Sequence, residues 1–88
     1  MKKIKDVSIG ESALFTLLVK SATIRQTKTG KPYLSMELFD GIETIQANYW
    51  DYREPNAPPK HSVLNLLANV VDFAGMKQLN VKNMYINT

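Results

Sequence analysis

The chain has 88 residues, carries a formal net charge of +3 and contains no cysteine. This length suffices for one small domain, which would bury roughly 60% of its unfolded surface, and the lack of cysteine excludes disulfide bridges and thiolate metal sites. The longest apolar run, residues 13–19, is too short to span a membrane, and the N-terminus lacks the apolar core of a signal peptide. We therefore expect a single cytoplasmic domain over residues 1–88, in which residues 1–11 form an N-terminal segment.

Alternation of apolar and polar residues dominates the chain, and helical periodicity is weak. The predicted strands, in chain order, are residues 13–25, 32–39, 43–50, 63–73 and 76–86. The first exceeds an ordinary strand in length, so we expect it to bend near Ser21-Ala22. Asp40-Gly41 and Ala74-Gly75 predict tight turns, and the prolines of residues 51–62 predict an irregular connection between the third and fourth strands.

Residues of one parity within each strand should face the core. In the last strand the parity of the apolar residues changes after Val81, which predicts a bulge near Lys82-Asn83. Such a bulge would return Met84 and Ile86 to the core. Five strands, a bent first strand and a long third connection indicate an all-β, five-stranded Greek-key barrel, the OB-fold. An SH3-like barrel is the alternative, but it usually has its long irregular loop earlier in the chain.

Catalytic and metal-binding signatures are missing. His61 is the lone histidine, and a zinc site would need further histidines or cysteines. The sequence has no nucleophile elbow, phosphate-cradling glycine loop or His-Glu zinc motif, and its eight acidic residues form no recognisable catalytic pair. We expect no catalysis by this chain and no cofactor, and we interpret His61 as a turn residue.

The runs TKTGKPYLSMELFDG and IETIQANYWD resemble OB domains of the anticodon-binding type, and most of all the N-terminal domain of the YhaM-type exoribonucleases, which work from the 3′ end. The matching positions are Lys28, Gly30 to Leu34, Asp40-Gly41, Ala47, Trp50-Asp51, the opening segment from Ile4 to Glu11, and Gly75, Gln78, Leu79 and Val81. In such enzymes a separate metal-binding HD domain carries the chemistry. The resemblance therefore implies a substrate-handling module that is one domain of a larger protein.

OB domains commonly bind ligands across the second and third strands and the flanking loops. Tyr33 and Trp50 lie on these strands with the parity opposite to the core, so we expect them to stack on bases. Cations of the flanking loops would follow the phosphates, and small or polar residues between the two rings would leave a groove open. The candidate nucleic-acid-binding residues are Tyr33, Trp50, Lys28, Lys31, Arg25, Ser35, Gln46, Asn48 and Lys77.

Other interpretations of the aromatic and acidic residues stay open. Trp50 would alternatively pack against Tyr52-Arg53, and the loop lysines would be ordinary solvated charges. For Phe39 and Phe73 we favour a role in the core or at a barrel end. Glu37 would repel phosphate if it faces the groove, unless it accepts a hydrogen bond from a base amino group.

Leu67 and Val71 have the parity opposite to the apolar core positions of the fourth strand. We expect them to be buried beneath the N-terminal segment; the alternative is a surface for self-association or for docking of another domain. The sequence thus predicts a non-catalytic module that binds single-stranded RNA or DNA, within a larger nuclease or a replication or repair protein. The alternative function is a protein-interaction or assembly module.

Overall fold

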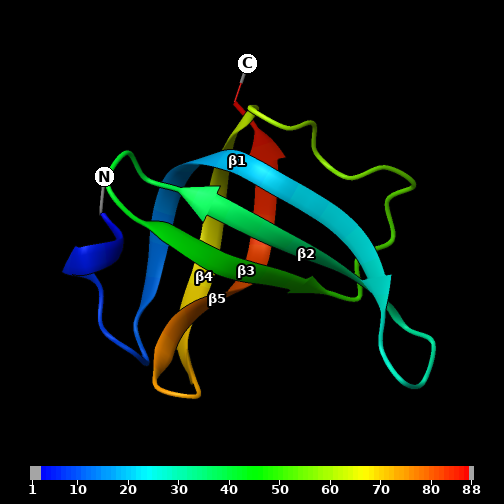
Figure 1. The fold of residues 1–88 in the computed structure, drawn as a ribbon, viewed down its shortest axis with the longest axis horizontal. Helices are drawn as coiled ribbons and strands as arrows, with labels where there is room; N and C mark the ends of the chain where they lie inside the picture. The colour runs from blue at the N-terminus through cyan, green and yellow to red at the C-terminus, as the bar shows by residue number, and fades with distance from the viewer. Residues whose placement is uncertain (1–2, 88) are drawn as a thin grey trace.

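The computed structural model describes residues 3–87, which form a five-stranded barrel with a short 3₁₀-helix beside it (Figure 1). The elements are η1 (Ile4–Asp6), β1 (Ser12–Gln26), β2 (Pro32–Phe39), β3 (Thr44–Trp50), β4 (Val63–Phe73) and β5 (Met76–Ile86). The barrel closes in the order β1-β2-β3-β5-β4, with β3 and β5 parallel and the other neighbours antiparallel. The predicted five-stranded Greek-key barrel is confirmed. Residues 1 and 2 of the expected N-terminal segment lie outside the described residues.

Strand boundaries agree with the sequence prediction to within one residue, and the one-residue difference at the start of β3 has a clear cause. The backbone N–H groups of Ile42 and Glu43 both donate to Asp40 Oδ1 at 2.7 Å. This side-chain turn keeps Glu43 out of the ladder, so β3 begins at Thr44. Gly41 has a φ of +101° in this turn, a conformation that glycine adopts without strain.

Two bulges shape the barrel. β1 pairs with β4 over Ser12–Leu18 and with β2 over Leu18–Gln26, and Lys20 is the extra residue within the second ladder. This places the bend one residue before the predicted position. In β5 the extra residue is Lys82, which confirms the predicted bulge.

The two apolar residues that follow the β5 bulge differ in burial. Met84 packs partly against the core, as predicted. Ile86 stays exposed, so the prediction of burial is wrong there. Ile86 pairs with Leu64 at the end of the barrel beside the Pro-rich connection, and it lines a pocket there that solvent reaches.

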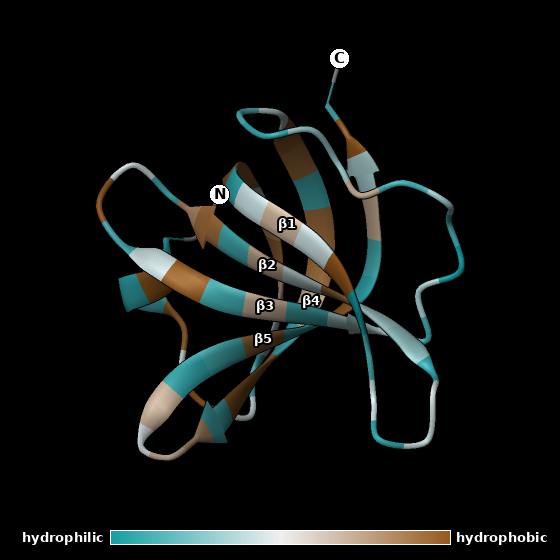
Figure 2. Cartoon of the chain, turned by 45° about the vertical axis from the view of Figure 1, so that its right-hand side comes forward, coloured by the Kyte–Doolittle hydropathy of each residue, from teal (hydrophilic) through white to brown (hydrophobic). Residues whose placement is uncertain are grey.

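Hydropathy alternates along the strands, as Figure 2 shows, because successive side chains point to opposite faces. The inward set forms one hydrophobic core. The connection of residues 51–62 is irregular, as predicted, and contributes Tyr52, which is only 8% exposed. The Tyr52 hydroxyl donates to the Asn56 carbonyl at 2.8 Å, and its ring lies 5.6 Å from the ring of Tyr49. The connection therefore closes one end of the barrel.

The N-terminal segment packs elsewhere on the barrel, where Ile4 and Val7 are buried. The Ile4 N–H donates to Asp40 Oδ2 at 2.9 Å, and the Lys3 ammonium donates to the Asp40 carbonyl at 2.7 Å. Burial by itself raises the pKa of the Asp40 carboxyl, but three backbone N–H donors and the charge of Lys3 outweigh it and hold the pKa below 3.8. Asp40 therefore joins the β2–β3 turn to the N-terminal segment.

None of the helical structure within residues 3–87 has the length and hydropathy needed to cross a membrane.

Candidate nucleic-acid interface

A groove of about 640 Å³ lies on the outer face of β2, β3 and β5 and reaches the end of β4. It brings together five of the nine predicted residues: Tyr33, Ser35, Gln46, Asn48 and Trp50. Its other lining residues, which sequence reasoning did not assign to the site, are Val71, Asp72, Phe73, Gln78 and Asn80. The groove is therefore wider than the predicted β2–β3 surface.

Tyr33 and Trp50 form an aromatic pair at one end of the groove. They are direct partners in the β2–β3 ladder, and their ring centroids are 4.7 Å apart at an interplanar angle of 35°. The Trp50 indole N–H donates to Asn80 Oδ1 at 3.2 Å, and 47% of Trp50 remains exposed. Trp50 therefore faces the groove, and the alternative of packing against the Tyr52-Arg53 segment is wrong.

The floor between the rings and the β4–β5 hairpin consists of uncharged side chains that hydrogen-bond to one another. The Gln46 amide nitrogen donates to Ser35 Oγ at 2.9 Å and to Asn48 Oδ1 at 3.1 Å. Asn48 in turn donates to Gln78 Oε1 at a longer 3.5 Å. The parallel ladder places Gln46 beside Gln78 and Asn48 beside Asn80. These contacts hold the amides in defined orientations. The side chains of the floor carry no charge.

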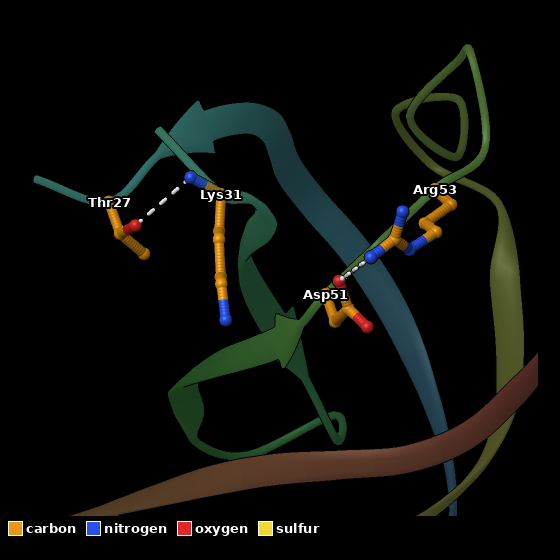
Figure 3. A network of polar contacts seen from close by, with 4 residues as sticks. All are labelled: Thr27, Lys31, Asp51 and Arg53. Atoms are coloured by element: carbon orange, nitrogen blue, oxygen red, sulfur yellow. Dashed lines mark hydrogen bonds and ion pairs between the residues drawn. The ribbon is translucent and has the colours of Figure 1, made fainter. Parts of the chain in front are cut away.

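The three predicted cations at the end of β1 and in the loop that follows it do not line the groove. Arg25 is the ladder partner of Tyr33, so it projects on the same face. Lys28 and Lys31 are exposed on residues 27–31. The Lys31 N–H donates to Thr27 Oγ1 at 3.1 Å, and the Lys31 side chain extends away from that contact (Figure 3). The hydrogen bond therefore fixes the loop backbone at Lys31, while the Lys31 ammonium group stays in solvent.

Three acidic residues lie in or beside this region: Asp72 lines the groove at the end of β4, and Asp51 and Glu37 flank it. Asp51 follows β3 directly and accepts a hydrogen bond from Arg53 at 2.8 Å (Figure 3). Both side chains are largely exposed, so the pair adds little stability. Glu37 is exposed opposite Gln46 on the outer face but lies outside the groove lining.

Lys77, the remaining predicted cation, lies away from the groove. Its Nζ donates to the Ile4 carbonyl at 3.3 Å, at the N-terminal segment. Its parity is that of the buried Leu79, whereas the groove is lined by Gln78 and Asn80. Lys77 therefore serves the packing of the N-terminal segment, and the structure does not join it with the other candidates.

Phe73 lies on the opposite rim from Tyr33 and Trp50. It precedes a two-residue turn in which Ala74 and Gly75 have φ values of +52° and +84°, the type I′ geometry that suits a hairpin. Phe73 is 64% exposed and lines the groove, so its predicted role in the core or at a barrel end is wrong. The β4–β5 hairpin and the loop of residues 27–31 project on the same side of the barrel (Figures 1 and 2).

Phe39 lies at the far end of the outer face of β2. It is half-buried, and the Lys20 ammonium sits 5.2 Å from its ring centroid. This contact is a cation–π interaction. His61 has a φ of +72°, which confirms its role as a turn residue.

Leu67 and Val71 lie in different depressions. Val71 lines the groove, whereas Leu67 lines a smaller depression of about 360 Å³ with Leu14 and Tyr85. Leu67 is 39% exposed, so the expected burial beneath the N-terminal segment is wrong for it. The N-terminal segment instead reaches β4 at Val70, through backbone hydrogen bonds with Gly10 and Glu11.

Among residues 3–87 no group of three or more histidine, cysteine, aspartate and glutamate side chains is arranged to hold a metal ion. The barrel order, the bent first strand and the groove across β2, β3 and β5 together define an OB-fold domain.

Similarity to known proteins agrees with the assignment to the OB-fold class. The chain is 28% identical over 85 residues to the 3′-5′ exoribonuclease YhaM of Listeria monocytogenes, which confirms the resemblance seen in the sequence. The match covers 94% of this chain but 27% of the enzyme, and the YhaM proteins of Listeria welshimeri and Listeria innocua give the same values. No family model matches the chain.

The fold also matches a solved structure, the second OB-fold domain of replication protein A from Methanococcus maripaludis. The TM-score is 0.75 at 19% identity, over 97% of this chain and 92% of that domain. At this identity the match shows the fold.

Proposed function

We propose that the groove binds single-stranded nucleic acid. The observation that carries this proposal is the pair of half-buried Tyr33 and exposed Trp50 beside a floor of hydrogen-bonded amides. Unpaired bases stack on aromatic rings, which contributes about 1–3 kcal/mol per base with little dependence on sequence. A duplex would keep its bases stacked on one another and unable to reach these rings.

The charges around the groove support the same ligand. Arg25, Lys28 and Lys31 stand on the rim beside the aromatic pair and remain free to contact phosphates. Neutralisation of three phosphates on a single strand predicts a log–log salt slope of about −2. The uncharged floor lets bases enter without burying an unpaired charge.

The relatives suggest where such a module works. An exoribonuclease acts on RNA, and the chain is similar to about a quarter of the length of that enzyme. We propose that the chain is a non-catalytic substrate-handling domain of a larger nuclease, or of a replication or repair protein. The cytoplasmic location expected from the cysteine-free sequence stays a prediction.

The test is a titration of Trp50 fluorescence with oligo(U) and with oligo(dT), at about 50 mM and about 200 mM salt. Trp50 is the only tryptophan in the sequence, so its emission reports on the groove. We expect saturable quenching that weakens at the higher salt concentration. Emission unchanged by either ligand, together with no gel shift, would contradict the proposal.

A second candidate function is assembly through the face formed by Leu14, Leu67 and Tyr85. These three exposed apolar side chains share a depression on the β1–β4–β5 surface, away from the groove. Self-association there should be abolished by Leu67→Asp and be unaffected by Tyr33→Ala. Sedimentation velocity over a range of protein concentrations tests this, and a wild-type monomer at every concentration would count against it.

A further inference from the structure

The orientation of the Asn80 amide follows from its contact with Trp50. An indole N–H can only donate a hydrogen bond, so the Asn80 carbonyl oxygen, 3.2 Å away, must face it. The Asn80 amide nitrogen then points away from the ring. Among the described residues this nitrogen has no protein acceptor. Every buried polar side-chain atom of those residues has a partner, so a nitrogen without one is not buried. The two N–H donors of Asn80 are therefore open to the groove.

The chain of amides orients Gln78 in the same sense. Gln46 donates to the Asn48 carbonyl oxygen, which turns the Asn48 nitrogen toward Gln78. Gln78 accepts with Oε1, so its own amide nitrogen also stays available. Gln78 and Asn80 are two residues apart on one strand and share the groove face. The β5 side of the groove consequently presents hydrogen-bond donors beside the stacking platform.

We propose that these donors make the groove selective for bases with a carbonyl oxygen at position 4, so that it prefers uracil or thymine to cytosine. The inference rests on the proposed binding of single-stranded nucleic acid. Uracil and thymine carry a carbonyl oxygen at position 4, which accepts a hydrogen bond from an amide N–H. Cytosine carries an amino group there, which is a donor and faces the amide donors without forming a bond.

Asn80 has a second role in this arrangement, as a positioning residue for Trp50. Its carbonyl oxygen holds the indole while its nitrogen faces the base, so the stacked base and the donor keep a constant relation. Recognition through a donor on a fixed side chain loses less conformational entropy than recognition through a mobile one.

The experiment compares oligo(U) with oligo(C), and oligo(dT) with oligo(dC), at equal length, by fluorescence polarisation of the labelled oligonucleotide. The members of each pair have the same number of phosphates and the same sugar, so their affinity ratio isolates the base. We expect a ratio of roughly three to ten in favour of uracil or thymine, the range that one net hydrogen bond gives. A preference in either sugar series supports the inference, and that series identifies RNA or DNA as the ligand.

Asn80→Asp tests the assignment to this residue. The carboxylate still accepts from the Trp50 N–H but replaces the donors with an acceptor, which suits the cytosine amino group. We expect the ratio to fall to about one or to reverse. Asn69→Asp is the matched control, because Asn69 is the ladder partner of Asn80 and adds the same charge one strand away. It should weaken binding of all four ligands and leave the ratios unchanged.

Gln78→Glu keeps the test decisive if Asn80→Asp fails to fold, since it removes the other donor and should also lower the ratio. A wild-type ratio of about one in both sugar series, or a ratio that neither variant changes, would overturn this inference while leaving the proposed function intact. Failure of the wild-type domain to bind any of the four oligonucleotides would instead overturn the proposed function.

Discussion

The end of β3 carries two aromatic residues in succession, Tyr49 and Trp50, and they belong to different regions of the molecule. Trp50 lies outside the barrel against Tyr33, with ring centroids 4.7 Å apart. Tyr49 lies inside against Tyr52, with centroids 5.6 Å apart. One residue step along a strand reverses the face of the side chain. Two tilted aromatic pairs thereby lie on opposite faces of the sheet. The outer pair belongs to the binding site proposed above, and the inner pair packs at the barrel end.

The surroundings of the two pairs account for this division. Tyr52 is 8% exposed and its hydroxyl bonds to the connection that closes the barrel, so its removal would open the core. Trp50 is 47% exposed and is oriented by one hydrogen bond to Asn80, so its removal would leave the core intact. Five substitutions test the comparison.

The largest expected effect is that of Tyr52→Ala on stability. The truncation leaves a cavity beside Tyr49 and frees the connection, so the free energy of unfolding should fall by about 3 kcal/mol. Oligonucleotide affinity, measured where the variant is still folded, should be unchanged. Chemical denaturation and polarisation titrations give the two quantities. A variant as stable as the wild type would contradict the structural role of the inner pair.

Trp50→Ala and Tyr33→Ala should have the converse effect. Loss of one stacking platform should weaken binding about tenfold, whereas the free energy of unfolding should change by no more than about 1 kcal/mol, the value of an exposed aromatic pair. Tyr85→Ala is the control, because Tyr85 is an exposed aromatic residue on another face. Wild-type affinity in the double variant would refute the groove assignment.

Tyr52→Phe sharpens the comparison through pH. Burial, then the charge of Glu54 and the neighbouring Tyr49, raise the pKa of Tyr52 above 10.0. The folded state thus favours the neutral phenol, and this contribution to stability is complete below pH 10 and is lost as pH rises through the folded-state pKa. Phenylalanine cannot ionise but lacks the hydrogen bond to Asn56, which should cost about 1 kcal/mol at neutral pH.

The stability difference between wild type and Tyr52→Phe should therefore shrink as pH rises above 10.0 and through the folded-state pKa of Tyr52. Denaturation curves across this range measure it, with Tyr85→Phe as the control for loss of a hydroxyl at an exposed site. A difference that is constant across the range would show that Tyr52 ionises equally in both states.

The smallest expected effect is that of Phe73→Ala on the opposite rim. Because Phe73 is an isolated ring on a hairpin, its loss should weaken binding only about threefold, below the effect of a full stacking platform. Met76→Ala is the matched control, since Met76 is the ladder partner of Phe73, is similarly exposed and does not line the groove. Equal effects of the two variants would remove Phe73 from the site.

Much of the fold was predictable because strand parity is a local property. Alternation gave the strands to within a residue, and the change of parity after Val81 gave the bulge at Lys82. The same rule predicted that Tyr33 and Trp50 face outward. The 3₁₀-helix Ile4–Asp6 was not predicted, because a single turn of three residues leaves no periodic signal.

The β5 side of the site escaped prediction because it depends on a non-local pairing. The parallel ladder that sets Gln46 beside Gln78 joins strands separated by β4, and no local pattern encodes it. Parity alone would have placed Gln78 and Asn80 on the outer face and Lys77 on the face of Leu79, but it would not have placed the first two beside β3. The exposure of Leu67 depends on which segment covers it, and the N-terminal segment packs elsewhere.

The bulge at Lys20 also bears on aggregation. β1 leaves β4 after Leu18 and continues beside β2 alone, so among the described residues its other edge from Ser21 to Gln26 has no ladder partner. A free edge invites a strand from another molecule to add to the sheet. Here the bulge bends the edge, and Lys20 and Arg25 place charges along it, two devices that oppose such addition. The cation beside the groove thus also protects the open edge that the bent strand creates.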